Sequence, residues 1–384
     1  MSICLCMIVK NESHVIESTL AHLCERIPFA YWVISDTGST DSTRELIRSF
    51  FQAQRIPGEL VEHTWKDFAY NRTKALECAF MKTDYLMVFD ADDAIVGTLS
   101  LPRLTADQYL ARFGTTESYT RPLILTNRKK WTYKGVLHEY LDAPETRTSV
   151  LLEGAYYIHS GRTGARNRNP RKYADDAKVL EKAFHEESNE FLKNRYAFYC
   201  AQSHLDAKHI EASIVWYTTC LRRNGWIQER YCACLQLGNL YAYKGQSALA
   251  LKHWCHASHY DPERIEGYVK AAILAYRKKD HTLVNQLYHR CKGYRLPLNK
   301  LFLQSQLYAY EIEFLNSTSA YHANDSRSGY ECCKTILLHH KDKDRVKHAL
   351  RTLSLYPKEL NQDRNFLFFL KTNLTKDVSR LLKI

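Results

Sequence analysis

The sequence predicts an α/β domain built on a parallel sheet, followed by an all-α region of helical repeats. Over the first 90 or so residues, short apolar runs alternate with stretches of helical periodicity, the pattern of βαβ units. One apolar run, Tyr85–Phe89, leads directly into the carboxylates of Asp90, Asp92 and Asp93. From about residue 173 the pattern is helical and repeats at intervals of about 34 residues.

Each strand is predicted from an apolar run, and each helix from apolar side chains that recur on one face. Strands are expected at 3–9, 31–35, 60–65 and 85–89. Helices are expected between them, at about 15–23, 42–54 and 71–81. The polar segments that follow the strands should meet in one crevice, because parallel strands end at the same edge of the sheet.

The composition is that of a globular protein of two or more domains. The chain has 384 residues, of which 45% are hydrophobic and 25% charged, and a net charge of +12 that suits an anionic partner. The 12 cysteines show no paired C-x-x-C pattern, which favours a reducing compartment over a zinc site. We expect a cytoplasmic protein, because the sequence shows neither a signal peptide nor an apolar run long enough to cross a membrane.

The three carboxylates after Tyr85–Phe89 predict a cation site. Buried charges are costly unless they are paired or bound to a metal, so these side chains should lie at the carboxyl end of the strand. Asp90 and Asp92 are two residues apart, so both could face one cation with Ala91 turned away. Mg²⁺ and Mn²⁺ prefer such oxygen ligands. A solvated acidic loop is the alternative interpretation of this short pattern.

Two later segments are rich in chemically active side chains. Trp131–Tyr140 contains three aromatic residues, a glycine, His138 and Glu139, and a second segment runs from Tyr157 to Arg162. Residues 161–172 then form a basic stretch, interpreted either as a solvated connector or as a phosphate contact.

The helical half repeats at Leu205, Leu240 and Leu274, each followed by a helix with a bulky aromatic residue. This spacing is similar to that of tetratricopeptide repeats. We therefore predict a first domain at 1–165, a basic linker and connecting helix at 166–190, repeats at 191–295, and a helical extension at 296–384. Within the extension, the polar stretch Ser317–Gly329 is expected to be a loop.

Four polar segments in this order resemble family 2 GT-A glycosyltransferases, the inverting enzymes that use nucleotide sugars. The segments are Lys10–Glu12, Asp36–Asp41, Phe68–Arg72 and Phe89–Asp93. Together with the repeats, they resemble the branch of that family which includes bacterial peptide S-glycosyltransferases. The resemblance covers about residues 1–295 and implies a metal-dependent hexosyltransferase with a GT-A domain, acting from a UDP-sugar onto a glycan or a protein or peptide.

The resemblance implies roles for named residues. Glu12, Asp36 and Asp41 would line the nucleoside pocket, although Asp41 also suits a helix N-cap. Asn71 and Arg72 should open a helix, where a phosphate meets the positive end of the dipole, although Arg72 could equally be a plain surface residue. The complete donor-binding set is Val9, Asn11, Glu12, Asp36, Ser39, Asp41, Asn71, Arg72, Asp90 and Ala91.

An inverting transferase needs a base that deprotonates the acceptor. Glu139 is the first candidate, Asp142 is the second, and His138 could orient Glu139 or touch the acceptor. The spacing from Asp90 is shorter than is common in the family, which leaves the base open between the two carboxylates. His159 resembles the late histidine that completes the metal site beside Asp90 and Asp92, although a lone histidine at a strand end is often structural.

The expected partners are a nucleotide sugar, an acceptor and, through the repeats, a second copy of the chain. The main alternative is a repeat scaffold whose first domain is an inactive nucleotide-binding relic. A nucleotidyltransferase is disfavoured, because Lys10–Ser13 lacks the glycine-rich loop usual after the first strand of that class. No motif supports nucleic-acid binding.

Overall fold

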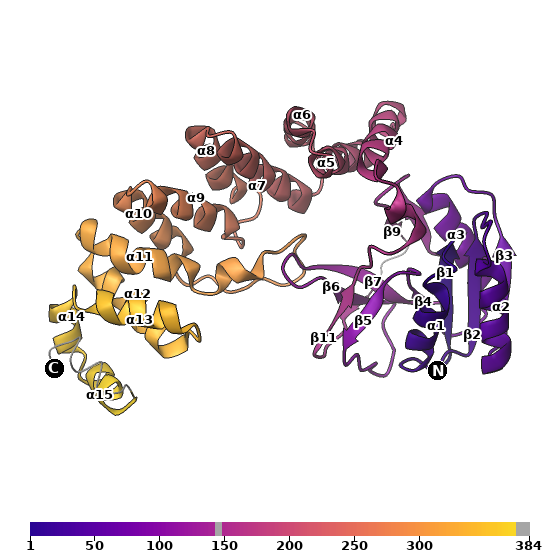
Figure 1. Ribbon diagram of the computed structural model, residues 1–384, viewed down its shortest axis with the longest axis horizontal. Coiled ribbons are helices and arrows are strands. Elements are labelled where there is room, and N and C mark those ends of the chain that lie inside the picture. Colours follow the sequence, from indigo (N-terminus) through magenta and orange to yellow (C-terminus); the bar gives the residue numbers. More distant parts are fainter. Residues whose placement is uncertain (143–147, 374–384) are drawn as a thin grey trace. The chain divides into compact units, whose positions relative to one another are not determined.

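The computed structural model describes residues 1–142 and 148–373, and the chain separates into two compact units. Unit 1 comprises Met1–Trp226 together with Asn299–Phe302, and unit 2 comprises Ile227–Leu298 and Leu303–Ile384. Figure 1 shows the α/β part of unit 1 and the helices that follow it. An α/β domain followed by a helical region is the predicted fold class, whereas the domain boundaries and the tetratricopeptide-like character of the helices stay predictions.

The sheet of unit 1 is mixed. Among the described residues, nine strands form it in the order β3-β2-β1-β4-β7-β6-β11-β5, with β10 beside β6. The strands are β1 Ile3–Val9, β2 Tyr31–Asp36, β3 Gly58–Glu62, β4 Tyr85–Val88, β5 Ala94–Gly97, β6 Gln108–Phe113, β7 Tyr119–Thr126, β10 Ser149–Leu151 and β11 Tyr156–His159. A separate hairpin joins β8 Thr132–Lys134 to β9 Tyr140–Asp142. The first four strands are parallel as predicted, but β7 runs antiparallel to β4.

Helices cover both faces of the parallel part, because the side chains of β1 alternate between two cores. Ile3, Leu5, Met7 and Val9 pack with the apolar face of α1 (Ile16–Cys24) and α2 (Thr43–Gln54). Cys4 and Cys6 point to the opposite face, toward Leu76 of α3 (Phe68–Ala79). The carboxyl end of this buried strand therefore lies between two helical layers, where Asn11 and Glu12 follow it.

The rest of unit 1 is helical. A short 3-10 helix, Ala165–Arg168, precedes α4 Lys172–Glu186, α5 Glu190–Asp206 and α6 Ile210–Leu221. Helix α5 packs against both α4 and α6.

Unit 2 consists of helices that pack mainly against their neighbours in sequence. They are α7 Ile227–Tyr243, α8 Ser247–Ala257, α9 Glu266–Arg277, α10 His281–Cys291, a 3-10 turn at Ser305–Tyr308, α11 Glu311–His322, α12 Ser326–His339, α13 Lys343–Leu353, α14 Pro357–Gln362 and α15 Arg364–Asn373. The last eleven residues of the predicted extension, 374–384, lie outside the described residues. In the described part of the chain, no helix combines the length and apolarity that crossing a bilayer requires.

The predicted strand at 60–65 lies two to three residues too late, since β3 spans Gly58–Glu62. Two further local predictions are wrong. Ser317–Gly329 is not a loop: α11 and α12 occupy most of it, because Asn316, Ser317 and Ser319 are fully buried inside the helix packing rather than solvated. Helix α3 begins at Phe68 rather than near Asn71, because the side chain of Asp67 accepts a hydrogen bond from the Tyr70 amide and caps it. Asn71 and Arg72 therefore lie inside the helix and do not open it.

Candidate active site

Arg72 is the centre of a buried charge cluster at the carboxyl end of the sheet. Its Nη2 donates to Oδ1 of Asp90 at 2.7 Å, and its Nε donates to Oε1 of Glu139 at 2.6 Å. The Arg72 side chain is 8% exposed and that of Glu139 is 10% exposed, so water screens these ion pairs little. The structure thus joins a residue of α3, one that follows β4 and one from the segment between β8 and β9.

Arg121 of β7 belongs to the same cluster. Its Nη2 lies 3.6 Å from Oδ2 of Asp90, so both oxygens of this carboxylate face a guanidinium group. Burial alone would raise the pKa of Asp90, but Arg72 and Arg121 outweigh it and hold that pKa below its ordinary value. No sequence pattern pointed to Arg121, because it lies inside a strand that is antiparallel to β4.

The two following carboxylates have the opposite electrostatics. Burial raises the pKa of Asp92, and the negative charge of Asp90 adds to the effect. Burial and Asp90 likewise raise the pKa of Asp93 to about 7. Arg72 and Arg121 offset the charge of Asp90 but not that of all three carboxylates. The segment after β4 therefore carries an excess of negative charge.

The ends of β1 and β2 are tied together by side chains that the sequence singled out. Oδ1 of Asn11 accepts from the Thr40 amide at 2.7 Å, and Oγ of Ser39 accepts from the Asn11 amide at 2.9 Å. Asn11 has a φ of 58°, a left-handed conformation that asparagine tolerates. The turn after β2 thereby lies directly beside the turn after β1.

Asp36 and Asp41 make different hydrogen bonds in that turn. Oδ1 of Asp36 accepts from the amides of Gly38 and Ser39, while its buried Oδ2 has no hydrogen-bond partner among the described residues. Asp41 accepts from the Thr43 amide and hydroxyl and from the Ser13 amide. Asp41 thus ties the starts of two helices together, whereas Asp36 keeps one acceptor atom available to a ligand.

Three other members of the predicted donor set serve the scaffold in this structure. The carbonyl oxygen of Val9 accepts from the Thr37 amide and hydroxyl. The carbonyl oxygen of Ala91 accepts from the Thr19 hydroxyl at 2.6 Å. The buried side chain of Asn71 binds the Lys66 amide and the Thr64 carbonyl, which holds the segment before α3 in place.

The glycine-containing segment 160–168 lies against the acidic residues. The Gly164 amide donates to Oδ2 of Asp92 at 3.0 Å, and the Ala165 amide donates to Glu12 at 3.2 Å. Burial raises the pKa of Glu12. A Cβ atom at Gly161 would lie 1.7 Å from the Asp92 carbonyl oxygen, so only glycine permits this approach. The first residues of the basic stretch 161–172 are therefore held by Asp92 and Glu12 and do not form a solvated connector.

The remaining predicted residues lie around this cluster. Asp142 pairs with Lys134 across the β8–β9 hairpin, with Oδ2 2.6 Å from Nζ. His159 is exposed at the end of β11 and pairs with Ala94, the residue after Asp93. Among the described residues, Asp90, Asp92 and His159 are not a set of three ligand side chains whose donor atoms lie within 4.8 Å of one another.

Helix α5 supports the segment that carries His138 and Glu139. Nε of Arg195 donates to the His138 carbonyl at 2.8 Å, and the Tyr196 hydroxyl accepts from the Val136 amide. The His138 ring stacks on Tyr199 with centroids 4.0 Å apart. This packing and the charges of Arg195 and Arg166 lower the pKa of His138, so its ring stays neutral. The sequence did not reveal this support, because its residues lie about 60 positions further along the chain.

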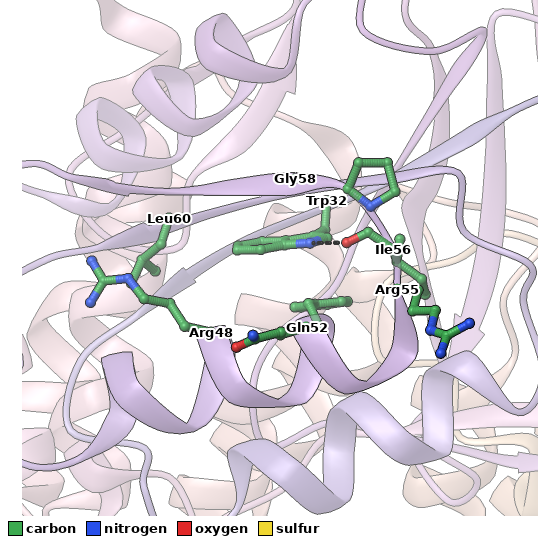
Figure 2. Close-up of a pocket in the computed structure, with 9 residues that line it drawn as sticks. Trp32, Arg48, Gln52, Arg55, Ile56, Gly58 and Leu60 are labelled. Carbon is green, nitrogen blue, oxygen red and sulfur yellow. Dashed lines mark hydrogen bonds between the residues drawn. The ribbon is translucent and has the colours of Figure 1, made fainter.

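A groove of about 500 Å³ lies elsewhere in unit 1, between α2 and the β2–β3 edge (Figure 2). The Trp32 ring occupies its centre, stacked 4.3 Å from Phe51 and donating through Nε1 to the Ile56 carbonyl. Arg48 and Arg55 flank it. None of the predicted site residues lines this groove in the described structure.

The comparison with protein families decides the interpretation of the N-terminal segment. Residues 4–106 match the model of glycosyl transferase family 2. This family 2 segment spans β1 to β5 and contains Asn11, Asp36, Arg72 and the carboxylates after β4. Together with the α/β sheet and the helices that follow, the match confirms a GT-A domain followed by a helical region as the fold class. No curated protein matches the chain.

Solved structures align with about two thirds of the chain at low similarity. S. aureus TarS 1–349 in complex with UDP-GlcNAc is 14% identical, and the alignment covers 67% of this chain and 91% of TarS 1–349 with a TM-score of 0.32. The mannosyltransferase PcManGT from Pyrobaculum calidifontis, in complex with GDP-Man and Mn²⁺, is 12% identical, with coverage of 66% and 86% and a TM-score of 0.33. At these scores neither structure supports a transfer of detail to this chain.

Proposed function

We propose that the chain is an inverting hexosyltransferase that moves a sugar from a UDP-sugar to a glycan, protein or peptide acceptor. The observation that carries the proposal is the family 2 match over residues 4–106, the segment whose strand ends hold the acidic cluster. We assign the steps of the reaction, on the basis of their contacts, to four residues: Asp36, Arg72, Asp90 and Glu139.

The nucleoside would bind at the ends of β1 and β2. The buried Oδ2 of Asp36 can accept a hydrogen bond, and uracil offers a ring N–H that would satisfy it. Asn11 and Ser39 shape the same turn through their bonds to each other's segments. This arrangement supports a donor whose base is a hydrogen-bond donor at a ring nitrogen.

The diphosphate would lie between the carboxylates after β4 and the basic segment that begins at Gly161. Lys172 and Arg168 from this segment interact electrostatically with Asp92 and Glu12, respectively, so they could contact the phosphates. The carboxylate oxygens of Asp90 and Asp92 fit a hard cation, and the mutual repulsion of these carboxylates favours one. Mn²⁺ or Mg²⁺ bound there would offset the charge of the diphosphate.

Glu139 is our choice for the base. It lies in the Arg72 cluster together with Asp90, whereas Asp142 is occupied by Lys134 on the hairpin. Arg72 orients the Glu139 carboxylate, which could accept the proton of the acceptor hydroxyl or thiol. The neutral His138 beside it would orient the segment or touch the acceptor.

The test is a panel of nucleotide sugars in which release of the nucleoside diphosphate is measured with and without chelator. We expect release from a UDP-sugar, and we expect chelator or Asp92→Asn to abolish it. Glu139→Gln should lower transfer to acceptor by about 100- to 10,000-fold, while Asp142→Asn, the matched control, changes it little.

Three outcomes would contradict the proposal. If no donor is turned over by the folded wild type, the first domain is a nucleotide-binding relic and the chain is a scaffold. If Asp142→Asn has the larger effect, the roles of the two carboxylates must be exchanged. Because the product's anomeric configuration is measurable by NMR, retention would contradict inversion.

A further inference from the structure

A second group of metal-type ligands lies in the helical part of unit 1, away from the acidic cluster. The group consists of Glu181 of α4 and Cys200 and His204 of α5. Each offers one ligand atom, and these three atoms lie within 4.8 Å of one another. Cys200 is completely buried, the His204 side chain is 12% exposed and that of Glu181 is 38% exposed. The group therefore has a buried sulfur at its base and two ligands at a rim that solvent reaches.

The helix geometry explains why these side chains meet. Cys200 and His204 are four residues apart on α5, a spacing that places both on one face of a helix. Glu181 reaches them from the neighbouring α4, which packs along α5. Nε2 of His204 lies 2.9 Å from Oε1 of Glu181.

Outer contacts orient two of the three ligands. Nε1 of Trp216 donates to Oε1 of Glu181 at 3.2 Å, and Nδ1 of His204 lies 3.3 Å from Nδ1 of His209. A histidine ligand in metalloproteins commonly uses its second ring nitrogen for such a contact, which fixes the ring and the tautomer. His209 provides that contact here.

We propose that Glu181, Cys200 and His204 bind a zinc-type divalent cation. One thiolate, one imidazole and one carboxylate form a donor set that suits Zn²⁺ or Co²⁺ and discriminates against Mg²⁺, which prefers oxygen alone. Three protein ligands leave one position of a tetrahedral site for water. A nucleophilic role for Cys200 is disfavoured, because the thiol is buried and burial raises its pKa.

Binding requires a defined change of protonation. On binding, Cys200 gives up its contact with the Ala177 carbonyl and releases its thiol proton to solvent. His204 would coordinate through Nε2 and carry its ring proton on Nδ1, which donates to Nδ1 of His209. Bonds of about 2.0–2.3 Å in a tetrahedron place ligand atoms roughly 3.4 Å apart. The contact between Glu181 and His204 must therefore widen by a few tenths of an ångström, which rotation of the half-exposed glutamate allows.

The site would brace the helix that supports the Glu139 segment. Tyr199, the residue before Cys200, stacks on His138, and Arg195 one turn earlier binds the His138 carbonyl. A cation that ties α4 to α5 would hold these residues in place. The inference concerns binding alone, so it stands independently of the proposed transferase activity.

The experiment titrates Co²⁺ into the 384-residue chain after metal has been removed and the cysteines have been reduced with a reductant that contains no thiol. Excess Mg²⁺ is present to saturate sites that offer only oxygen ligands. We expect one equivalent to bind, with visible bands of tetrahedral cobalt and a thiolate charge-transfer band in the near ultraviolet. Zn²⁺ should displace it. Cys200→Ser should abolish the charge-transfer band, and Glu181→Gln and His209→Ala should weaken binding by about tenfold or more.

Matched controls separate this site from the other cysteines and histidines of the chain. Cys24→Ser, on α1, and His185→Gln, on α4, should bind cobalt like the wild type. If Cys200→Ser does not fold, His204→Gln, at the rim, decides the matter by losing the tetrahedral bands. Wild type without a saturable thiolate band, or equal bands in His204→Gln and the wild type, would overturn the proposal.

Discussion

Arg72 forms ion pairs with both Asp90 and Glu139, two carboxylates that would repel each other without it. Because the Arg72 and Glu139 side chains are almost entirely buried, Arg72→Met removes the ion pair of Glu139 away from water and leaves Asp90 with Arg121 alone. Breaking a buried pair by removing one partner commonly costs about 3–5 kcal/mol of unfolding free energy. We expect a loss of that order in urea denaturation, together with loss of donor turnover.

A double-mutant cycle checks the physical cause. The variant Arg72→Met/Glu139→Gln should recover part of the lost stability, because the amide carries no charge to desolvate. Strictly additive losses would mean that the two side chains are not coupled, contrary to their 2.6 Å contact.

Asp41 makes a stability contribution that depends on pH. Burial would raise its pKa, but hydrogen bonds from Thr43 and Ser13 outweigh burial and lower the pKa from 3.8 to about 2. A carboxylate with a depressed pKa in the folded state stabilises it fully above pH 3.8, and this contribution is lost as the pH falls through 2.

Asp41→Asn should therefore lower the unfolding free energy by about 1–2 kcal/mol at pH 6. The difference in unfolding free energy between this variant and the wild type should become smaller as the pH falls from 4 toward 2. Chemical denaturation at each pH measures this difference. Asp142→Asn is the control whose difference from the wild type should stay small throughout. A difference that is constant with pH would contradict the assigned cause.

At the scale of residues, the sequence singled out Asp90, Arg72 and Glu139, which the structure joins in one cluster, but it gave no sign of Arg121. Asp90 was singled out because carboxylates directly after a buried strand are unusual, and Glu139 because the resemblance implies a late carboxylate as the base. Arg121 carried no such signal, since its position follows from a strand that turns back antiparallel to β4. Pairing between distant strands is decided by packing that no local pattern records.

At the scale of elements, the segment 160–168 depends on glycine at one position. Gly161→Ala would place a methyl group on the Asp92 carbonyl, so the segment must move away and lose the bonds from Gly164 and Ala165. We expect weaker donor binding and faster cleavage by trypsin after Arg162, Arg166 or Arg168.

Thr163→Ala is the control within the same segment, because its side chain is exposed. It should leave donor affinity and the trypsin rate unchanged. Equal trypsin rates for Gly161→Ala and the wild type would show that the close approach to Asp92 does not hold the segment.

The elements themselves divide into those that local patterns predict and those they do not. Buried apolar runs placed β1, β2 and β4 almost to the residue, because a strand covered on both faces must be apolar throughout. The predicted start of α3 lies three residues too late, because the helix begins at Phe68, directly after the capping Asp67. In α11, small polar residues that bond inside the packing were mistaken for a solvated loop.

At the scale of the whole molecule, the first compact unit runs to Trp226, includes α5 and also contains the short later segment Asn299–Phe302. A chain that ends at Asn169 lacks Arg195, Tyr196 and Tyr199, which hold the Glu139 segment. It should melt at a lower temperature and turn over donor poorly. A chain that ends at Trp226 should keep donor turnover and lose transfer to acceptor or self-association, if the later helices serve recognition or assembly.

The measurements are donor titration, acceptor transfer and mass in solution for both truncated chains. Unchanged transfer and unchanged mass in the chain that ends at Trp226 would remove any role for the later helices in recognition or assembly. Equal stability of the two truncated chains would contradict the support that α5 gives to residues 135–140.

The central place of β1 has a consequence for how the chain is made. This strand precedes both of its partners along the chain, and it pairs with β2 on one side and with the much later β4 on the other. Both of its faces are apolar, with Leu5 and Met7 on one side and Cys4 and Cys6 on the other. During synthesis, one edge of β1 therefore stays unpaired and can associate with other chains until β4 has left the ribosome. A chaperone that binds extended apolar segments would raise the yield of folded protein during this period.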